Sequence, residues 1–231
     1  MPNYSDFNSA EMTQALKFFP LVGIFIGAVT ASVFSLSALL LPTDVALSLS
    51  ILSSILLTGA LHEDGLADTC DGLGGGRDAE HCLSIMQDSR LGSYGVLALV
   101  LALLIKFTVL QHFSPSQLPF ILIAAHSSSR LLSMLLMYKL SYLRSHGKAQ
   151  AFIMNLQTAD LAWAAVFGLA PLLLMWPLTV AILPVLAIWW WFYRLLKRRL
   201  QGYTGDCLGA MQQLGEIAFY LAALTLGGNH Y

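Results

Sequence analysis

The stretch "PLVGIFIGAVTASVFSLSALLL", residues 20–41, holds no charged side chain. A helix that crosses the hydrocarbon core of a bilayer needs about 20 mostly apolar residues, so this stretch predicts a transmembrane helix. Lipid offers no hydrogen-bond partner to an exposed backbone, which favours a helix over isolated strands.

The same pattern recurs along the chain. Hydrophobic residues make up 57% of the 231 residues and charged residues only 11%, whereas a soluble domain carries about 25% charged residues. We therefore predict an all-α, polytopic transmembrane bundle of about seven spans, forming a single integral-membrane domain over residues 1–231. Besides 20–41, the predicted spans are 45–61, 93–113, 119–138, 161–176, 178–196 and 211–227.

The positions of the basic residues predict the orientation of this bundle. Seven spans place 1–19, 62–92, 139–160 and 197–210 on one side of the membrane. Cytoplasmic loops are the ones rich in Lys and Arg, so we expect the N-terminus and these segments in the cytoplasm. The net charge of −1 gives no indication of nucleic acid as a partner. Ten of the 12 Lys and Arg lie in or beside these segments: Lys17, Arg77, Arg90, Lys139, Arg144, Lys148, Arg194, Lys197, Arg198 and Arg199.

Two glycines in the first predicted span have the G-x-x-x-G spacing. Gly23 and Gly27 lie one helical turn apart, and small residues at this spacing let two helices approach closely. The alternative is that the two small residues are unrelated. The sequence leaves both alternatives open, and it leaves a homo-oligomer open as well.

An acidic stretch, "HEDGLADTCDGLGGGRD" at 62–78, opens the predicted cytoplasmic loop at about 62–92. Asp64, Asp68 and Asp71 are spaced i, i+4 and i+7, which places them on one face of a helix. Like charges at this spacing repel by a few tenths of a kcal/mol per pair, and a divalent cation would offset that repulsion. Carboxylates suit Mg²⁺ or Mn²⁺, so we favour a metal site over a solvated helix end.

Two further polar motifs lie on the same predicted side. In "MQDSRLGSYG", 86–95, Asp88 or Ser89 can cap the following helix, and Arg90 can bind a phosphate or extend to the membrane edge. In "TGDCLGA", 204–210, Asp206 heads the last span and is either a helix cap or part of a site.

Two ionisable residues lie inside apolar runs, where a charge is costly and usually faces a partner or a cavity. These are Arg130, within "HSSSRLLSMLLMY" at 126–138, and Glu216 in the last predicted span. One interpretation is a structural Arg130–Glu216 ion pair between two helices. The other is a polar floor beneath a substrate site. Lys106 is given no role.

Together these strings resemble the cobalamin synthase family, also called adenosylcobinamide-GDP ribazoletransferase. The resemblance covers about residues 18–220 and is carried by FFPLVGIFIG, HEDGLADTCDG, MQDSRLGSYG, the Ser-Arg of HSSSRLLSMLLMY, and TGDCLGA followed by Glu216. It implies a Mg²⁺-dependent, multi-pass enzyme of the inner membrane whose site faces the cytoplasm. Such an enzyme joins adenosylcobinamide-GDP to α-ribazole or its 5′-phosphate, releases GMP, and forms adenosylcobalamin or its 5′-phosphate.

The resemblance also suggests roles for the residues in these motifs. Phosphoryl transfer depends on positioning and on charge neutralisation. We therefore expect Asp64, Asp68 and Asp71 to hold Mg²⁺, Asp206 and Arg90 to be catalytic, and the substrate-binding residues to include Asp88, Ser89, Arg130 and Glu216.

Two other functions are compatible with parts of this sequence. A CDP-alcohol phosphotransferase also joins a membrane bundle to an Asp-rich helix, but its motif requires Ala-Arg where this chain has Ala67-Asp68. A cation-coupled transporter could use Glu216, Arg130 and Lys106. Transporters place their coupling groups near the midplane and often show inverted repeats, whereas the carboxylates here concentrate at one surface.

Overall fold

The computed structural model describes residues 15–143, 156–173, 179 and 181–227. Within these ranges the protein is all-helical, as predicted, with a single β-bridge between Tyr142 and Tyr203. The helices are α2 (Phe19–Ser37), α3 (Thr43–Thr58), α4 (Leu61–Gly75), α5 (Ala79–Met86), α6 (Ser93–Leu110), α7 (Leu118–Lys139), α8 (Thr158–Leu173), α9 (Ile182–Arg199) and α10 (Gly205–Gly227).

Several of these helices are suited to a membrane. Among the described residues, α2, α6 and α7 are long and apolar enough to cross a bilayer, and α3 with α4 would make a fourth crossing if the bent pair is counted as one span. Helix α8 is apolar but shorter. The structure therefore supports a membrane-embedded protein with three or four such helices, and the finer count of seven spans stays a prediction. The predicted turn at 176–177 lies outside the described residues.

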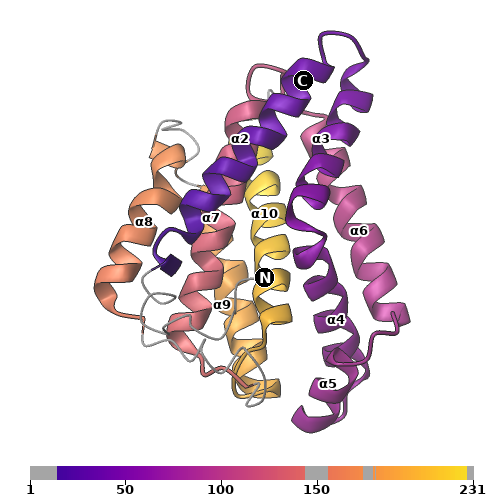
Figure 1. The fold of residues 1–231 in the computed structure, drawn as a ribbon, viewed down its shortest axis with the longest axis vertical. Coiled ribbons are helices and arrows are strands. Elements are labelled where there is room, and N and C mark those ends of the chain that lie inside the picture. The colour runs from indigo at the N-terminus through magenta and orange to yellow at the C-terminus, as the bar shows by residue number, and fades with distance from the viewer. Residues whose placement is uncertain (1–14, 144–155, 174–178, 180, 228–231) are drawn as a thin grey trace, which may run out of the picture.

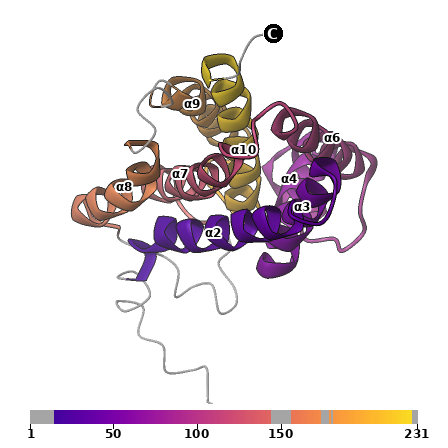
Figure 2. The same ribbon diagram turned by 90° about the horizontal axis from the view of Figure 1, so that it is seen from above.

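Helices α7 and α10 form the centre of the bundle, and the other helices surround them (Figures 1 and 2). Helix α7 is buried along most of its length, and α10 packs against α4, α6, α7 and α9. Because α10 contacts helices from both halves of the chain, it brings distant motifs together.

The Gly23–Gly27 spacing lets α2 lie directly on α7. A β-carbon at Gly27 would lie 2.6 Å from the Cα of Ile123, and one at Gly23 would collide with the backbone of His126. A close approach of two helices is therefore confirmed, and it takes place within one chain.

The acidic stretch that opens the segment 62–92 is a packed helix, so the helix predicted through Asp64, Asp68 and Asp71 is confirmed. Gly59 and Ala60 both adopt left-handed backbone, with φ of 62° and 58°, and their N–H groups bond to Leu56 and Ile55 at the end of α3. The chain then turns by 84° into α4. Helix α4 packs against α10 and α6 (Figure 1), so the acidic side chains are held by the bundle.

Candidate active site

The two acidic motifs meet at Gly65, between Asp64 and Asp68 on α4. A β-carbon at Gly65 would lie 2.7 Å from the carbonyl oxygen of Asp206 and 3.1 Å from its Cα. Glycine is needed because the backbone of α10 approaches α4 this closely. Asp64 is exposed, and Asp68 and Asp206 are half-buried. Gly65 and Asp206, which are 141 positions apart in the sequence, are thus in direct contact.

Thr204, and not Asp206, caps helix α10. The hydroxyl of Thr204 accepts a hydrogen bond from the N–H of Cys207 at 3.4 Å and donates to Oδ2 of Asp206 at 3.1 Å. A side-chain oxygen that accepts from the third helical N–H is the usual N-cap arrangement. Thr204 therefore holds the N-cap position, and Asp206 lies in the first turn of α10 with its carboxylate bonded to the Thr204 hydroxyl. The catalytic role of Asp206 stays a prediction.

Asp71, the third acid of the stripe, supports the start of α6. Its Oδ2 accepts the N–H of Gly92 at 2.8 Å, and its Oδ1 accepts the N–H of Gly95 at 2.9 Å. A carboxylate at this end of a helix also interacts favourably with the helix dipole. The expectation that Asp88 or Ser89 would cap this helix is wrong, because Asp71 reaches it from α4.

Asp88, Ser89 and Arg90 lie on the connection between α5 and α6. The Arg90 guanidinium bonds to the Asp88 carboxylate through two nitrogens, Nη2 being 2.5 Å from Oδ2. These hydrogen bonds lower the pKa of Asp88 to about 2 and raise the pKa of Arg90. The Arg90 side chain is 87% exposed, and Ser89 is exposed beside it. Arg90 therefore stays charged at the surface, where an anion can reach it.

The donors around Gly65 suit a hard divalent cation. Asp64, Asp68 and Asp206 offer carboxylate oxygens, and Mg²⁺ typically takes one or two carboxylates together with waters and substrate phosphates. Over the described parts of the chain, no group of three His, Cys, Asp or Glu side chains is arranged to hold a metal by protein ligands alone. A magnesium ion shared with a diphosphate needs fewer protein ligands, so the residues fit that kind of site. The predicted metal role of Asp71 stays a prediction.

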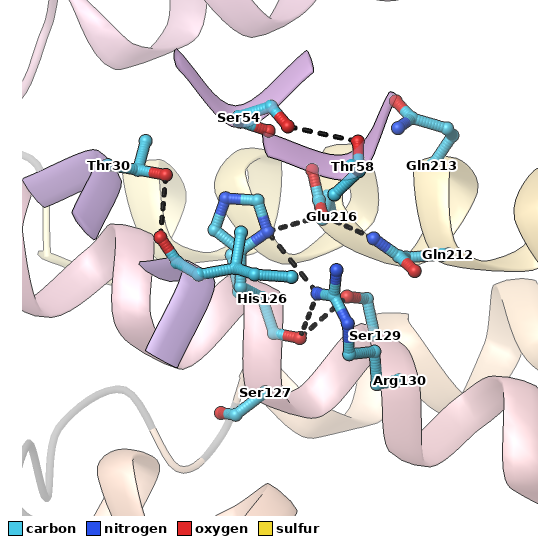
Figure 3. Close-up of polar contacts among 12 residues, drawn as sticks. Thr30, Ser54, Thr58, His126, Ser127, Ser129, Arg130, Gln212, Gln213 and Glu216 are labelled. Atoms are coloured by element: carbon cyan, nitrogen blue, oxygen red, sulfur yellow. Dashed lines mark hydrogen bonds and ion pairs between the residues drawn. The ribbon is translucent and has the colours of Figure 1, made fainter. Parts of the chain in front are cut away.

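A buried polar network lies deeper in the bundle, around Glu216 (Figure 3). Glu216 Oε2 lies 2.6 Å from Nζ of Lys106 on α6, and Oε1 lies 2.9 Å from Nδ1 of His126 on α7. Gln212 adds a hydrogen bond to Oε1 at 3.2 Å. Three helices are thereby joined by one carboxylate that is 1% exposed. Sequence reasoning gave Lys106 no role and did not identify His126.

The predicted direct ion pair between Arg130 and Glu216 is wrong. Nη1 of Arg130 donates to the His126 carbonyl oxygen at 2.9 Å and lies 3.5 Å from the His126 ring (Figure 3). The His126 ring thus lies between the guanidinium and the carboxylate. Arg130 is fully buried, and its Nε and Nη2 have no hydrogen-bond partner among the described residues. The two charges belong to one network without touching.

Glu63 connects this network to the acidic helix. Nε2 of Gln213 donates to Oε1 of Glu63 at 2.9 Å, while Oε1 of Gln213 accepts from Lys106 at 2.5 Å. A cavity of about 20 Å³ is lined by Glu63, Lys106, His126 and Glu216 among others, which is room for about one water. The buried ions are therefore linked by hydrogen bonds to the residue beside Asp64.

The fold and site define an all-helical membrane protein with carboxylates gathered where two of its helices meet. The family model for cobalamin-5-phosphate synthase matches residues 1–224. The chain belongs to this family, which confirms the resemblance drawn from the motifs.

Curated relatives agree over nearly the whole chain. An adenosylcobinamide-GDP ribazoletransferase of Ralstonia pickettii is 40% identical over 222 residues, covering 94% of this chain and 87% of the relative. One of Shewanella halifaxensis is 39% identical over 234 residues, covering 98% and 90%. No solved structure matches.

Proposed function

We propose that this protein joins adenosylcobinamide-GDP to α-ribazole or α-ribazole 5′-phosphate. A ribose hydroxyl attacks the phosphorus on the cobinamide side of the diphosphate, the bond to GMP breaks, and the hydroxyl loses its proton. Adenosylcobalamin or its 5′-phosphate results. The observation that carries the proposal is the contact of Asp206 with Gly65, which sets a second acidic motif against the Asp64–Asp68 face, in a chain of this family.

The positions of the acidic and basic side chains suggest a role for each of them in the reaction. When bound, Mg²⁺ neutralises charge on the diphosphate, and Asp64 and Asp68 are its expected protein ligands. Asp71 belongs to the same predicted metal face, and through Gly92 and Gly95 it also fixes the loop that carries Arg90. The exposed Arg90 would stabilise charge on the departing GMP. Asp88 and Ser89 would contact substrate beside it.

Arg130 and Glu216 are proposed as a buried floor beneath the site. Their exposed fractions are 0% and 1%, so direct contact with a substrate would require the bundle to open. Their network reaches the acidic helix through Gln213 and Glu63. We propose that they hold α4, α6, α7 and α10 in the arrangement that the reaction requires.

Asp206 is proposed to orient or deprotonate the ribose hydroxyl. Asp206→Asn should retain thermal stability, because Thr204 supplies the helix cap, and should lower Mg²⁺-dependent GMP release by at least about tenfold. The measurement uses purified protein, adenosylcobinamide-GDP and α-ribazole, with Thr204→Ser as a control that keeps the capping hydroxyl. Normal turnover in Asp206→Asn would remove Asp206 from the site. No GMP release by the unchanged protein would refute the function itself.

For the membrane arrangement we propose seven spans in an inner membrane, with the N-terminus and the acidic helix on the cytoplasmic side. The support is the distribution of Lys and Arg described above. On this topology, the connection between α6 and α7 faces outward, and α5 faces the cytoplasm.

A labelling experiment tests this orientation. Ser116→Cys should react with a membrane-impermeant maleimide on intact cells, whereas Glu80→Cys should react only after permeabilisation. Both positions are exposed in the structure, so access across the membrane decides the result. The reverse pattern would invert the proposed topology.

A further inference from the structure

Helix α9 presents two different faces. Val185, Phe192 and Leu196 are buried against the bundle, and Trp189 also turns inward, where its Nε1 donates to the carbonyl of Leu132 at 3.2 Å. The opposite face is exposed and changes character along the helix. It begins with leucines, continues with two tryptophans that are 51% and 53% exposed, and ends with bases: Leu183, Leu186, Trp190, Trp191, Arg194, Lys197 and Arg198.

The aromatic and basic residues of this face line one groove of about 900 Å³. The rings of Trp190 and Tyr193 stack with centroids 5.5 Å apart. The Arg194 guanidinium lies 5.8 Å from the centre of Trp190, and the Lys197 ammonium lies 5.9 Å from the centre of Tyr193. The cations thus rest on aromatic faces and leave their N–H donors available to an anion.

The bases of this groove form no ion pair with any described residue. In the described part of the chain no carboxylate lies within ion-pair distance of Arg194, Lys197 or Arg198. Arg199, in the same turn, behaves differently, because its Nη2 donates to the carbonyl of Gly76 at 2.7 Å. Bases in a last turn also interact with the helix dipole. That effect explains neither the groove nor the paired aromatic rings.

We infer that the groove binds the headgroup of an anionic phospholipid. The order leucine, tryptophan, base along one exposed face matches the order of acyl chains, interface and headgroups in a bilayer, where Trp and Tyr occupy the interface. Three cations that pair with no described carboxylate lie beside the aromatic rings, and they complement the negative charge of a phosphate. Leu183 and Leu186 would lie along the acyl chains of the same lipid.

The site lies at the same end of the bundle as the acidic helix, because Arg199 links α9 to the end of α4. A bound anionic lipid would therefore fix the depth of α9 in the membrane near the proposed catalytic carboxylates. The inference does not depend on which reaction those carboxylates carry out. It requires only that α9 lies in the membrane with its basic end at the interface.

Native mass spectrometry of the purified full-length protein tests the site, with phosphatidylglycerol and phosphatidylcholine of equal acyl length as probes. The unchanged protein should bind phosphatidylglycerol more tightly. Each base near an anionic surface contributes about fivefold in affinity, so the triple variant R194Q/K197Q/R198Q should bind it at least about tenfold more weakly. Its affinity for phosphatidylcholine should stay unchanged.

A matched variant removes the same charge elsewhere. K17Q/R77Q/K139Q neutralises three bases on separate segments and should retain phosphatidylglycerol. Equal binding of the two lipids by the unchanged protein, or equal loss in both triple variants, would overturn the inference. Displacement of bound phosphatidylglycerol by GDP would overturn it by assigning the groove to a nucleotide. Dissociation of a dimer in R194Q/K197Q/R198Q with lipid binding intact would assign it to a second copy of the chain.

Discussion

Asp64→Asn and Asp68→Asn are each expected to lower GMP release at limiting Mg²⁺ by at least about 100-fold. Loss of a group that only supports a metal ligand costs about 10- to 100-fold, so loss of a ligand itself should cost at least the upper figure. The substitution removes one charge at nearly constant shape, so the bundle should stay folded. Asp64 is exposed and Asp68 half-buried, and both flank the point where α10 meets α4. The measurement is the rate of GMP release as a function of Mg²⁺ concentration.

Glu80 supplies the control for this prediction, and Asp71, which belongs to the predicted metal face, supplies a comparison of stability. Glu80→Gln removes an exposed charge from α5 and should leave the rate unchanged. Asp71→Asn should lower stability, because one of two carboxylate oxygens that accept backbone N–H groups becomes a donor. The loss should be about 1–3 kcal/mol. Near-normal rates at limiting Mg²⁺ for Asp64→Asn and Asp68→Asn would favour a solvated helix end over a metal face.

Lys106→Met is expected to destabilise the protein by about 3–5 kcal/mol, because it leaves Glu216 as a buried charge without its closest cation. Glu216→Gln should cost a similar amount, since Lys106 then faces only neutral groups. The double variant Lys106→Met/Glu216→Gln should be more stable than the worse single variant by at least about 1 kcal/mol. Thermal unfolding of the purified protein in one detergent gives all three values.

The matched comparison pairs Glu216→Gln with Arg130→Met. Because His126 lies between Arg130 and Glu216, the coupling in this second cycle should be smaller than in the Lys106 cycle. Strictly additive losses for Lys106→Met and Glu216→Gln would contradict the 2.6 Å ion pair. Stronger coupling to Arg130 than to Lys106 would restore the original ion-pair prediction.

Apolar runs and local motifs in the sequence predict much of this fold. The run at 20–41 becomes α2, and 93–113 and 119–138 become α6 and α7, because a long apolar segment has few alternatives in lipid. The break at Gly59–Ala60 was not predicted. It depends on two consecutive left-handed residues, one of them alanine, and local sequence does not favour that conformation in a residue with a β-carbon.

The partners of Glu216 could not be predicted from depth alone. Helix α10 begins at Gly205, and at 1.5 Å per residue Glu216 lies about 17 Å along it. Lys106 lies about 20 Å from the start of α6, and His126 and Arg130 lie about 20 Å and 14 Å from the end of α7. All three lie at similar depths. The choice among them is made by the way α6, α7 and α10 pack around Glu216, which the sequence does not give.

The bend between α3 and α4 has a consequence for the depth of the acidic face in a membrane. Helix α3 has 16 residues and a length of about 24 Å, which is shorter than the roughly 30 Å hydrocarbon core. Because the chain turns by 84° into α4, the first turn of α4, which carries Glu63 and Asp64, adds little length along the axis of α3. We therefore expect hydrophobic mismatch between α3 and the bilayer, a property of the lipid and not of the chain, to set how close these carboxylates lie to the headgroups.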